Sequence, residues 1–226
     1  MRAGPKFGDG PLSRAVAAVY TLLVVEALLL ATTAPGLVAL LLLDRDAGNA
    51  PLAALCALPV GPALSAALYA MHHRGRDVTD LRPAAAFWRG YRTNLRDSLR
   101  VWAPYLAWLT VVALGLGVAG APGGAPAWWS TLLVLVSVAA ALWLANALVI
   151  SSLFAFRGVD VARLAAYFLV RTPGVTLGTA GLLVAAVAVT VLSSEGVLAL
   201  LGSLLAAALV RTARPMIAMV RQEFTA

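Results

Sequence analysis

Long apolar runs separated by short polar segments make up most of this chain. A helix needs about 20 mostly apolar residues to cross the hydrocarbon core of a bilayer. We interpret six stretches as spans, at about 15–43, 51–71, 99–119, 128–154, 174–192 and 196–210. The pattern therefore predicts an all-α fold, a polytopic transmembrane helix bundle of about six spans that forms a single domain over residues 1–226.

The first and the last runs leave the span boundaries open. As one straight helix the first run would be roughly 44 Å long, well beyond a hydrocarbon core of about 30 Å. Pro35, followed by Gly36, therefore predicts a break near residue 35. Only Ser193, Ser194 and Glu195 separate the last two runs, which predicts a tight helical hairpin. Five spans remain the alternative if these two runs are misread.

The basic residues decide between the two counts. With six spans, 16 of the 17 Lys and Arg residues fall on one side, and the other side holds Arg45 with three acidic residues. Basic loops stay cytoplasmic. The six-span arrangement therefore predicts that the N-terminus and the C-terminus are both cytoplasmic. A five-span arrangement would place the last three arginines outside, so six spans are favoured.

Composition supports a membrane protein and indicates which class of partner it binds. The chain is 62% hydrophobic and 12% charged, with a mean hydropathy of +0.89, whereas soluble domains carry about 25% charged residues. The first run is too long for a cleaved signal peptide, so it is expected to stay as a span in the cell membrane. The net charge is +7, and the basic residues that produce it lie beside the apolar runs. This placement favours anionic lipids of the inner leaflet over nucleic acid.

The stretch between the second and third spans contains an amphipathic segment, residues 83–98. Aromatic and leucine side chains at three- and four-residue steps define an apolar face, which comprises Trp88, Tyr91, Leu95, Leu99 and Trp102. A neighbouring stripe is basic and comprises Arg89, Arg92, Arg96 and Arg100. We expect a helix that lies along the inner leaflet before it turns into the third span. It is either a solvated face that fixes topology or a docking surface for a cytoplasmic partner or lipid, formed by Trp88, Arg89, Tyr91, Arg92 and Arg96.

Glu26 is the one acidic residue well inside a predicted span. A charge at that depth is costly, so the side chain should face the bundle interior, be protonated or find a partner. Candidate partners are Ser65, Asn146 and hydroxyls of other spans. Glu26 is interpreted as a structural contact between helices. The alternative is a proton or cation relay, in which Glu26, Asn146 and Ser65 form an intramembrane polar site.

Sequence patterns that carry catalysis or hold cofactors are absent. The chain has no zinc-protease motif, no phosphate-binding loop and no nucleophile elbow. Its single cysteine, Cys56, excludes an intramolecular disulfide and any multi-cysteine metal site. We therefore expect no enzyme, no metal and no cofactor.

Several motifs in the first half resemble the YesL-like family, bacterial multi-span membrane proteins whose domain has no known function. The resemblance is clearest from about residue 7 to residue 109. It is carried by Gly-Pro-Ala-Leu-Ser-Ala-Ala-Leu-Tyr at 61–69 and Phe-Trp-Arg-Gly-Tyr-Arg-Thr-Asn at 87–94. Glu26 departs from it, because the family usually has Asn in the first span.

The resemblance implies a context of sugar uptake, since such proteins are often encoded beside carbohydrate ABC importers. It implies no mechanism. The leading hypothesis is an accessory or partner-binding membrane protein, with ABC importer components as candidate partners. The alternative is a small transporter or channel with a polar path near Glu26 and Asn146.

Overall fold

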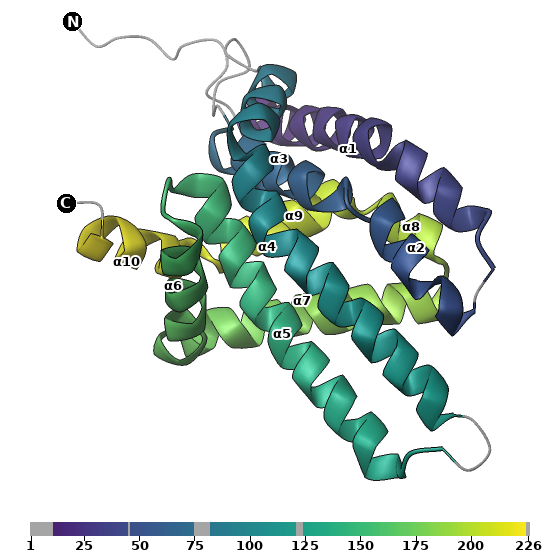
Figure 1. Cartoon of the computed structure of the whole chain (residues 1–226). Coiled ribbons are helices and arrows are strands. Elements are labelled where there is room, and N and C mark those ends of the chain that lie inside the picture. The colour runs from purple at the N-terminus through teal and green to yellow at the C-terminus, as the bar shows by residue number, and fades with distance from the viewer. Residues whose placement is uncertain (1–10, 45, 75–81, 121–123, 225–226) are drawn as a thin grey trace, which may run out of the picture.

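The computed structural model describes residues 11–44, 46–74, 82–120 and 124–224, and their secondary structure is entirely helical (Figure 1). The helices are α1 (Pro11–Leu41), η1 (Ala47–Asn49), α2 (Ala50–Cys56), α3 (Val60–His72), α4 (Pro83–Ala119), α5 (Ala127–Leu153), α6 (Gly158–Arg171), α7 (Pro173–Leu192), α8 (Glu195–Ala199), α9 (Gly202–Thr212) and α10 (Arg214–Phe224). The predicted all-α bundle is confirmed.

The described residues contain between four and six candidate membrane spans, judged by length and composition. Four helices, α1, α4, α5 and α7, are each long and apolar enough to cross a bilayer. Two bent pairs pass the same test together: η1 and α2 with α3, bent by 44°, and α9 with α10, bent by 53°. Counting each bent pair as one span gives six.

The expected break near Pro35 is absent, because α1 continues through that residue to Leu41. Proline removes one backbone hydrogen bond, here the bond to the carbonyl of Ala31, yet the helix continues. A Cβ atom at Gly36 would overlap the carbonyl oxygen of Cys56, so the backbone of α2 packs directly on α1 at this point.

The expected turn between the 83–98 segment and the third span is also absent. Both belong to α4, a helix of 37 residues that is about 55 Å long. The hydrocarbon core is about 30 Å thick. The 83–98 segment therefore continues in the same helix as the third span instead of turning away from it to lie along the leaflet.

Two further elements differ from the predicted spans. The sixth predicted span, 196–210, is interrupted at Leu200 and Leu201, which separate α8 from α9. Between α5 and α7 lies an additional amphipathic helix, α6, which buries Val161, Ala165 and Phe168 on one face. Residues four and three apart share a helix face, so this spacing explains why one side of α6 packs and the other is exposed.

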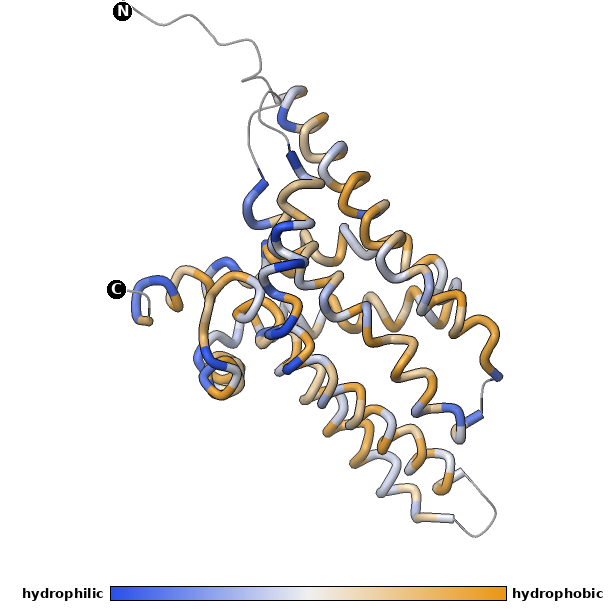
Figure 2. The backbone as a smooth tube through the Cα atoms, turned by 45° about the horizontal axis from the view of Figure 1, so that its top comes forward, coloured by the Kyte–Doolittle hydropathy of each residue, from blue (hydrophilic) through white to orange (hydrophobic). Residues whose placement is uncertain are grey.

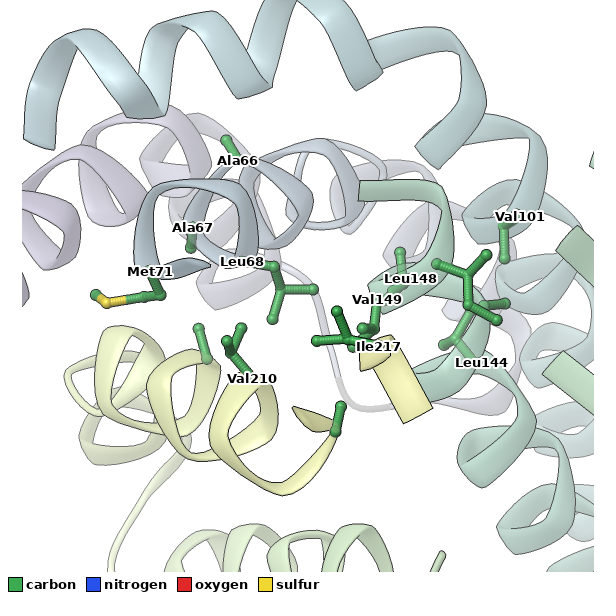
Figure 3. Packing of buried hydrophobic residues seen from close by; sticks show 14 of the residues in the cluster. Ala66, Ala67, Leu68, Met71, Val101, Leu144, Leu148, Val149, Val210 and Ile217 are labelled. Carbon is green, nitrogen blue, oxygen red and sulfur yellow. The ribbon is translucent and has the colours of Figure 1, made fainter. Parts of the chain in front are cut away.

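The short helix α3 lies at the centre of the bundle and packs against α1, α4, α5 and α9. Nine of its 13 residues are buried, as expected of a helix that is apolar or small on all sides. Figure 3 shows Leu68 and Met71 of α3 facing Val210 of α9, and Ile217 of α10 beside Val149 of α5. Small side chains allow helix backbones to approach closely in a membrane, which explains the alanine-rich sequence of α3.

The two ends of the bundle differ in character. The beginning of α1, the beginning of α4, α6 and α10 lie toward one end, while η1, α2 and α8 lie toward the other (Figure 1). Figure 2 shows hydrophilic positions gathered around α6, α10 and the beginning of α4. The arginines of these helices are therefore concentrated at one end.

Candidate functional site

The 83–98 segment of α4 packs on the bundle through small and polar residues. Phe87, Gly90 and Ser98 are buried on the inward face. A Cβ atom at Gly90 would lie 2.7 Å from Cβ of Tyr69, so α3 and α4 cross closely here. Asn94 donates from Nδ2 to the carbonyl of Ser152 at 2.9 Å, which ties α4 to the end of α5. The inward face is therefore fixed by specific contacts on two neighbouring helices.

The predicted apolar face of Trp88, Tyr91 and Leu95 does not coincide with the buried face of this segment. Trp88, which the sequence placed among the docking residues, is 42% exposed. Tyr91 is half-buried and packs at the edge of the core. Close helix packing in a bilayer selects small residues over large ones. Gly90 and Asn94 therefore occupy the buried stripe, and Trp88 is left at the surface.

The outward face carries the arginine stripe. Arg89, Arg92 and Arg96 are all exposed, and within the described residues none of them has a carboxylate partner. The neighbouring Arg100 pairs with Asp97 at 2.9 Å on the same helix. Trp88 and Tyr91 lie beside the stripe, with ring centroids 5.7 Å apart. The docking residues proposed from the sequence thus share one accessible region of a rigid helix.

Glu26 contacts the beginning of α9. Its Oε2 accepts a hydrogen bond from the backbone N–H of Ser203 at 2.6 Å. Leu201, the N-cap residue of α9, has no side chain that could accept this hydrogen bond. A carboxylate near a helix N-terminus interacts favourably with the free N–H groups and with the helix dipole. Glu26 therefore serves as a cap for a helix that lies 177 residues further along the chain.

The depth of this contact explains why α9 needs a cap from another helix. Glu26 lies near the middle of α1, roughly 22 Å from Pro11. In a bilayer core no water is present to satisfy free backbone groups, so interrupted helices occur only where protein covers them. At this interruption Glu26 satisfies the N–H of Ser203, while the side chain of Leu200 is 61% exposed. A Cβ atom at Gly202 would lie 3.2 Å from Cδ1 of Leu29, a tight contact, so this glycine allows the beginning of α9 to pack closely on α1.

Ser65 and Asn146 have partners other than Glu26. Ser152 donates its hydroxyl to Oγ of Ser65 at 2.8 Å, linking α5 to α3. Asn146 donates from Nδ2 to the carbonyl of Ala165 at 3.4 Å, linking α5 to α6. No hydrogen bond among the described residues connects either side chain to Glu26. The three predicted polar residues are therefore three separate helix-to-helix contacts, and Oε1 of Glu26 is left buried without a partner.

Several residues of these contacts were not predicted from the sequence. Ser203, Ser152 and Asn94 act through long-range pairing, which hydropathy does not reveal. One signal was available: Asn94 ends the Phe-Trp-x-x-Tyr-x-x-Asn motif, and Phe87, Gly90 and Asn94 all lie on the packed face.

The described residues contain no group of three or more His, Cys, Asp or Glu side chains that could hold a metal ion. Residues 22–116, from α1 into the second half of α4, match the family model described as "Protein of unknown function, DUF624". The resemblance to the YesL-like family is consistent with this match. No curated protein and no solved structure matches the chain.

Proposed function

We propose that this chain, with its DUF624 match over residues 22–116, is a non-enzymatic accessory protein of the cell membrane that presents the 83–98 segment to a cytoplasmic partner. Both termini lie in the cytoplasm in this proposal. The observation that carries it is the outward face of α4, where Arg89, Arg92 and Arg96 are exposed without carboxylate partners among the described residues.

Two physical arguments support the orientation. Hydrophilic positions gather at the end of the bundle that holds the beginning of α4, α6 and α10 (Figure 2), and these helices carry arginines there. Basic loops remain on the cytoplasmic side. The length of α4 also exceeds the hydrocarbon core. The basic start of α4 is the part that extends into the headgroup layer and the cytoplasm.

The partner is expected to be acidic at its contact surface. Exposed arginines beside an aromatic side chain suit carboxylate-rich protein surfaces, and Trp and Arg are enriched where interfaces are strongest. The YesL-like resemblance points to sugar uptake, so the proposed partners are components of a carbohydrate ABC importer. Anionic lipids of the inner leaflet would hold the same stripe when no partner is bound.

Replacing Arg89, Arg92 and Arg96 together with Gln should abolish partner binding while leaving the bundle folded. Each arginine near an anionic leaflet contributes about 1 kcal/mol to the binding free energy between the segment and the leaflet. The three arginines of the stripe together contribute roughly 3 kcal/mol at low salt. We expect amide exchange from about residue 84 to residue 98 to become faster, and co-purification of importer subunits in mild detergent to fall more than tenfold.

The matched control replaces Arg157, Arg163 and Arg171 with Gln, which removes the same charge around α6. This variant should keep both the exchange protection of 84–98 and the co-purifying subunits. If the α4 variant also keeps both, the stripe serves only as a topology signal and the docking proposal is wrong.

A small transporter is the second candidate, favoured by the buried, unpartnered Oε1 of Glu26 beside an interrupted helix. Half-helix ends at mid-membrane are characteristic of transporter binding sites. In that case proteoliposomes would show a proton- or cation-coupled flux that the Glu26→Gln variant lacks. We expect no such flux.

A further inference from the structure

A cavity of about 270 Å³ lies where the end of α3 meets α9 and the start of α10. One wall is apolar and consists of Met71, Leu204, Ala207, Ala208 and Val210. The rim is basic and consists of Arg74, Arg211 and Arg214. Met71 and Val210 are visible on the two facing helices in Figure 3. The cavity is therefore amphipathic, with its charge confined to one edge.

The positive charge of this rim is uncompensated within the described residues. None of the three guanidinium groups has a carboxylate partner there, and no acidic side chain lines the cavity. A second cavity, of about 240 Å³, also has Arg74 in its wall, together with His73, Arg82 and Arg89. Arg74 thus contributes to two basic cavities, and their combined field attracts an anion to this point.

The depth of the cavity suits a lipid. The contact with Glu26 places the beginning of α9 near the middle of α1. The 11 residues of α9 then rise about 16 Å, roughly half the thickness of the hydrocarbon core. Arg211 and Arg214 consequently reach the headgroup level, while Leu204 and Ala208 remain at the depth of the acyl chains.

We propose that this cavity binds one anionic phospholipid of the surrounding leaflet. Its phosphate group lies among Arg74, Arg211 and Arg214, and the first part of an acyl chain lies against Leu204 and Ala208. Guanidinium groups bind phosphate through paired, charge-assisted hydrogen bonds. The apolar wall supplies a contact that a free phosphate ion cannot use. This site is separate from the outward stripe of α4 and does not depend on the proposed accessory role.

The test measures binding of a short-chain phosphatidylglycerol to the full-length protein in detergent by native mass spectrometry. Each arginine near an anionic surface contributes about 1 kcal/mol to binding. Replacing Arg74 and Arg211 with Gln should therefore weaken binding about thirtyfold. Ala208→Leu, which fills the apolar wall without changing charge, should also weaken binding. The control variant Arg163→Gln with Arg171→Gln removes equal charge from α6 and should bind as the wild type does.

Any one of four results would overturn the proposal. Equal binding by the Arg74, Arg211 variant and the wild type would show that the rim holds no phosphate group. If inorganic phosphate displaces the lipid at equal concentration, or if Ala208→Leu binds normally, the site recognises a free anion and not a lipid. Short-chain phosphatidylcholine, whose headgroup has no net charge, should bind at least tenfold more weakly than phosphatidylglycerol, and equal binding would likewise contradict a charge-selective site.

Discussion

Gly61→Leu should strongly destabilise the bundle. A Cβ atom at Gly61 would overlap the indole of Trp102, the side chain through which α4 packs on α3. This indole cannot move freely, because its Nε1 donates to the carbonyl of Ala57 at 3.0 Å. Overpacking costs about 1–3 kcal/mol, and losing the hydrogen bond adds about 1 kcal/mol. We expect the apparent melting temperature in detergent to fall by about 5 °C or more.

The matched control is Gly181→Leu on α7. Nothing lies within 4 Å of a Cβ atom built there, so a leucine meets open space and favours the helix by up to about 1 kcal/mol. The control should melt at the wild-type temperature or slightly above it. If Gly61→Leu melts like Gly181→Leu, α3 and α4 do not pack as closely as described, and the central position of α3 is wrong.

Glu26→Lys should be the most damaging charge change within the spans. It replaces the acceptor for the N–H of Ser203 with an ammonium donor that faces the positive end of the α9 dipole. A lysine at the centre of a spanning helix costs about 2.5–3.5 kcal/mol by itself. We expect loss of folded protein in detergent, measured by size-exclusion chromatography and thermal melting.

Two further variants separate capping from charge. Glu26→Gln keeps a carbonyl oxygen that can accept from Ser203 and should change stability by less than about 1 kcal/mol. Glu26→Ala leaves that N–H without its acceptor and should cost about 1–2 kcal/mol, as other cap deletions do. If Ala and Gln variants are equally stable, Glu26 does not cap α9.

Hydropathy predicted α5 and α7 well because each of them alone is long enough to cross a bilayer. The fourth span, 128–154, and the fifth, 174–192, agree with α5 and α7 to within a residue at each end. The short helices were harder to predict. α3 and α9 span only 13 and 11 residues, so neither is long enough to cross a bilayer alone.

The candidate site was predicted in part. Arg89, Arg92 and Arg96 lie together on an exposed face, since a three- and four-residue spacing fixes one side of a helix. The buried face of α4 was not predicted, because hydropathy draws attention to Trp88, whereas close packing selects Gly90. Glu26 was singled out by its depth, but its partner is a backbone N–H, and no residue type in the sequence identifies such a donor.

The location of the basic end tests the central claim most directly. Reporter fusions that distinguish the two sides of the membrane should be placed after Arg82, after Arg163 and at the C-terminus, and also near Asp46 and Gly124. The account predicts a cytoplasmic signal at the first three positions and an external signal at the other two. An external signal at the C-terminus would contradict six crossings, and an external signal at Arg82 would place the α4 stripe where no cytoplasmic partner could reach it.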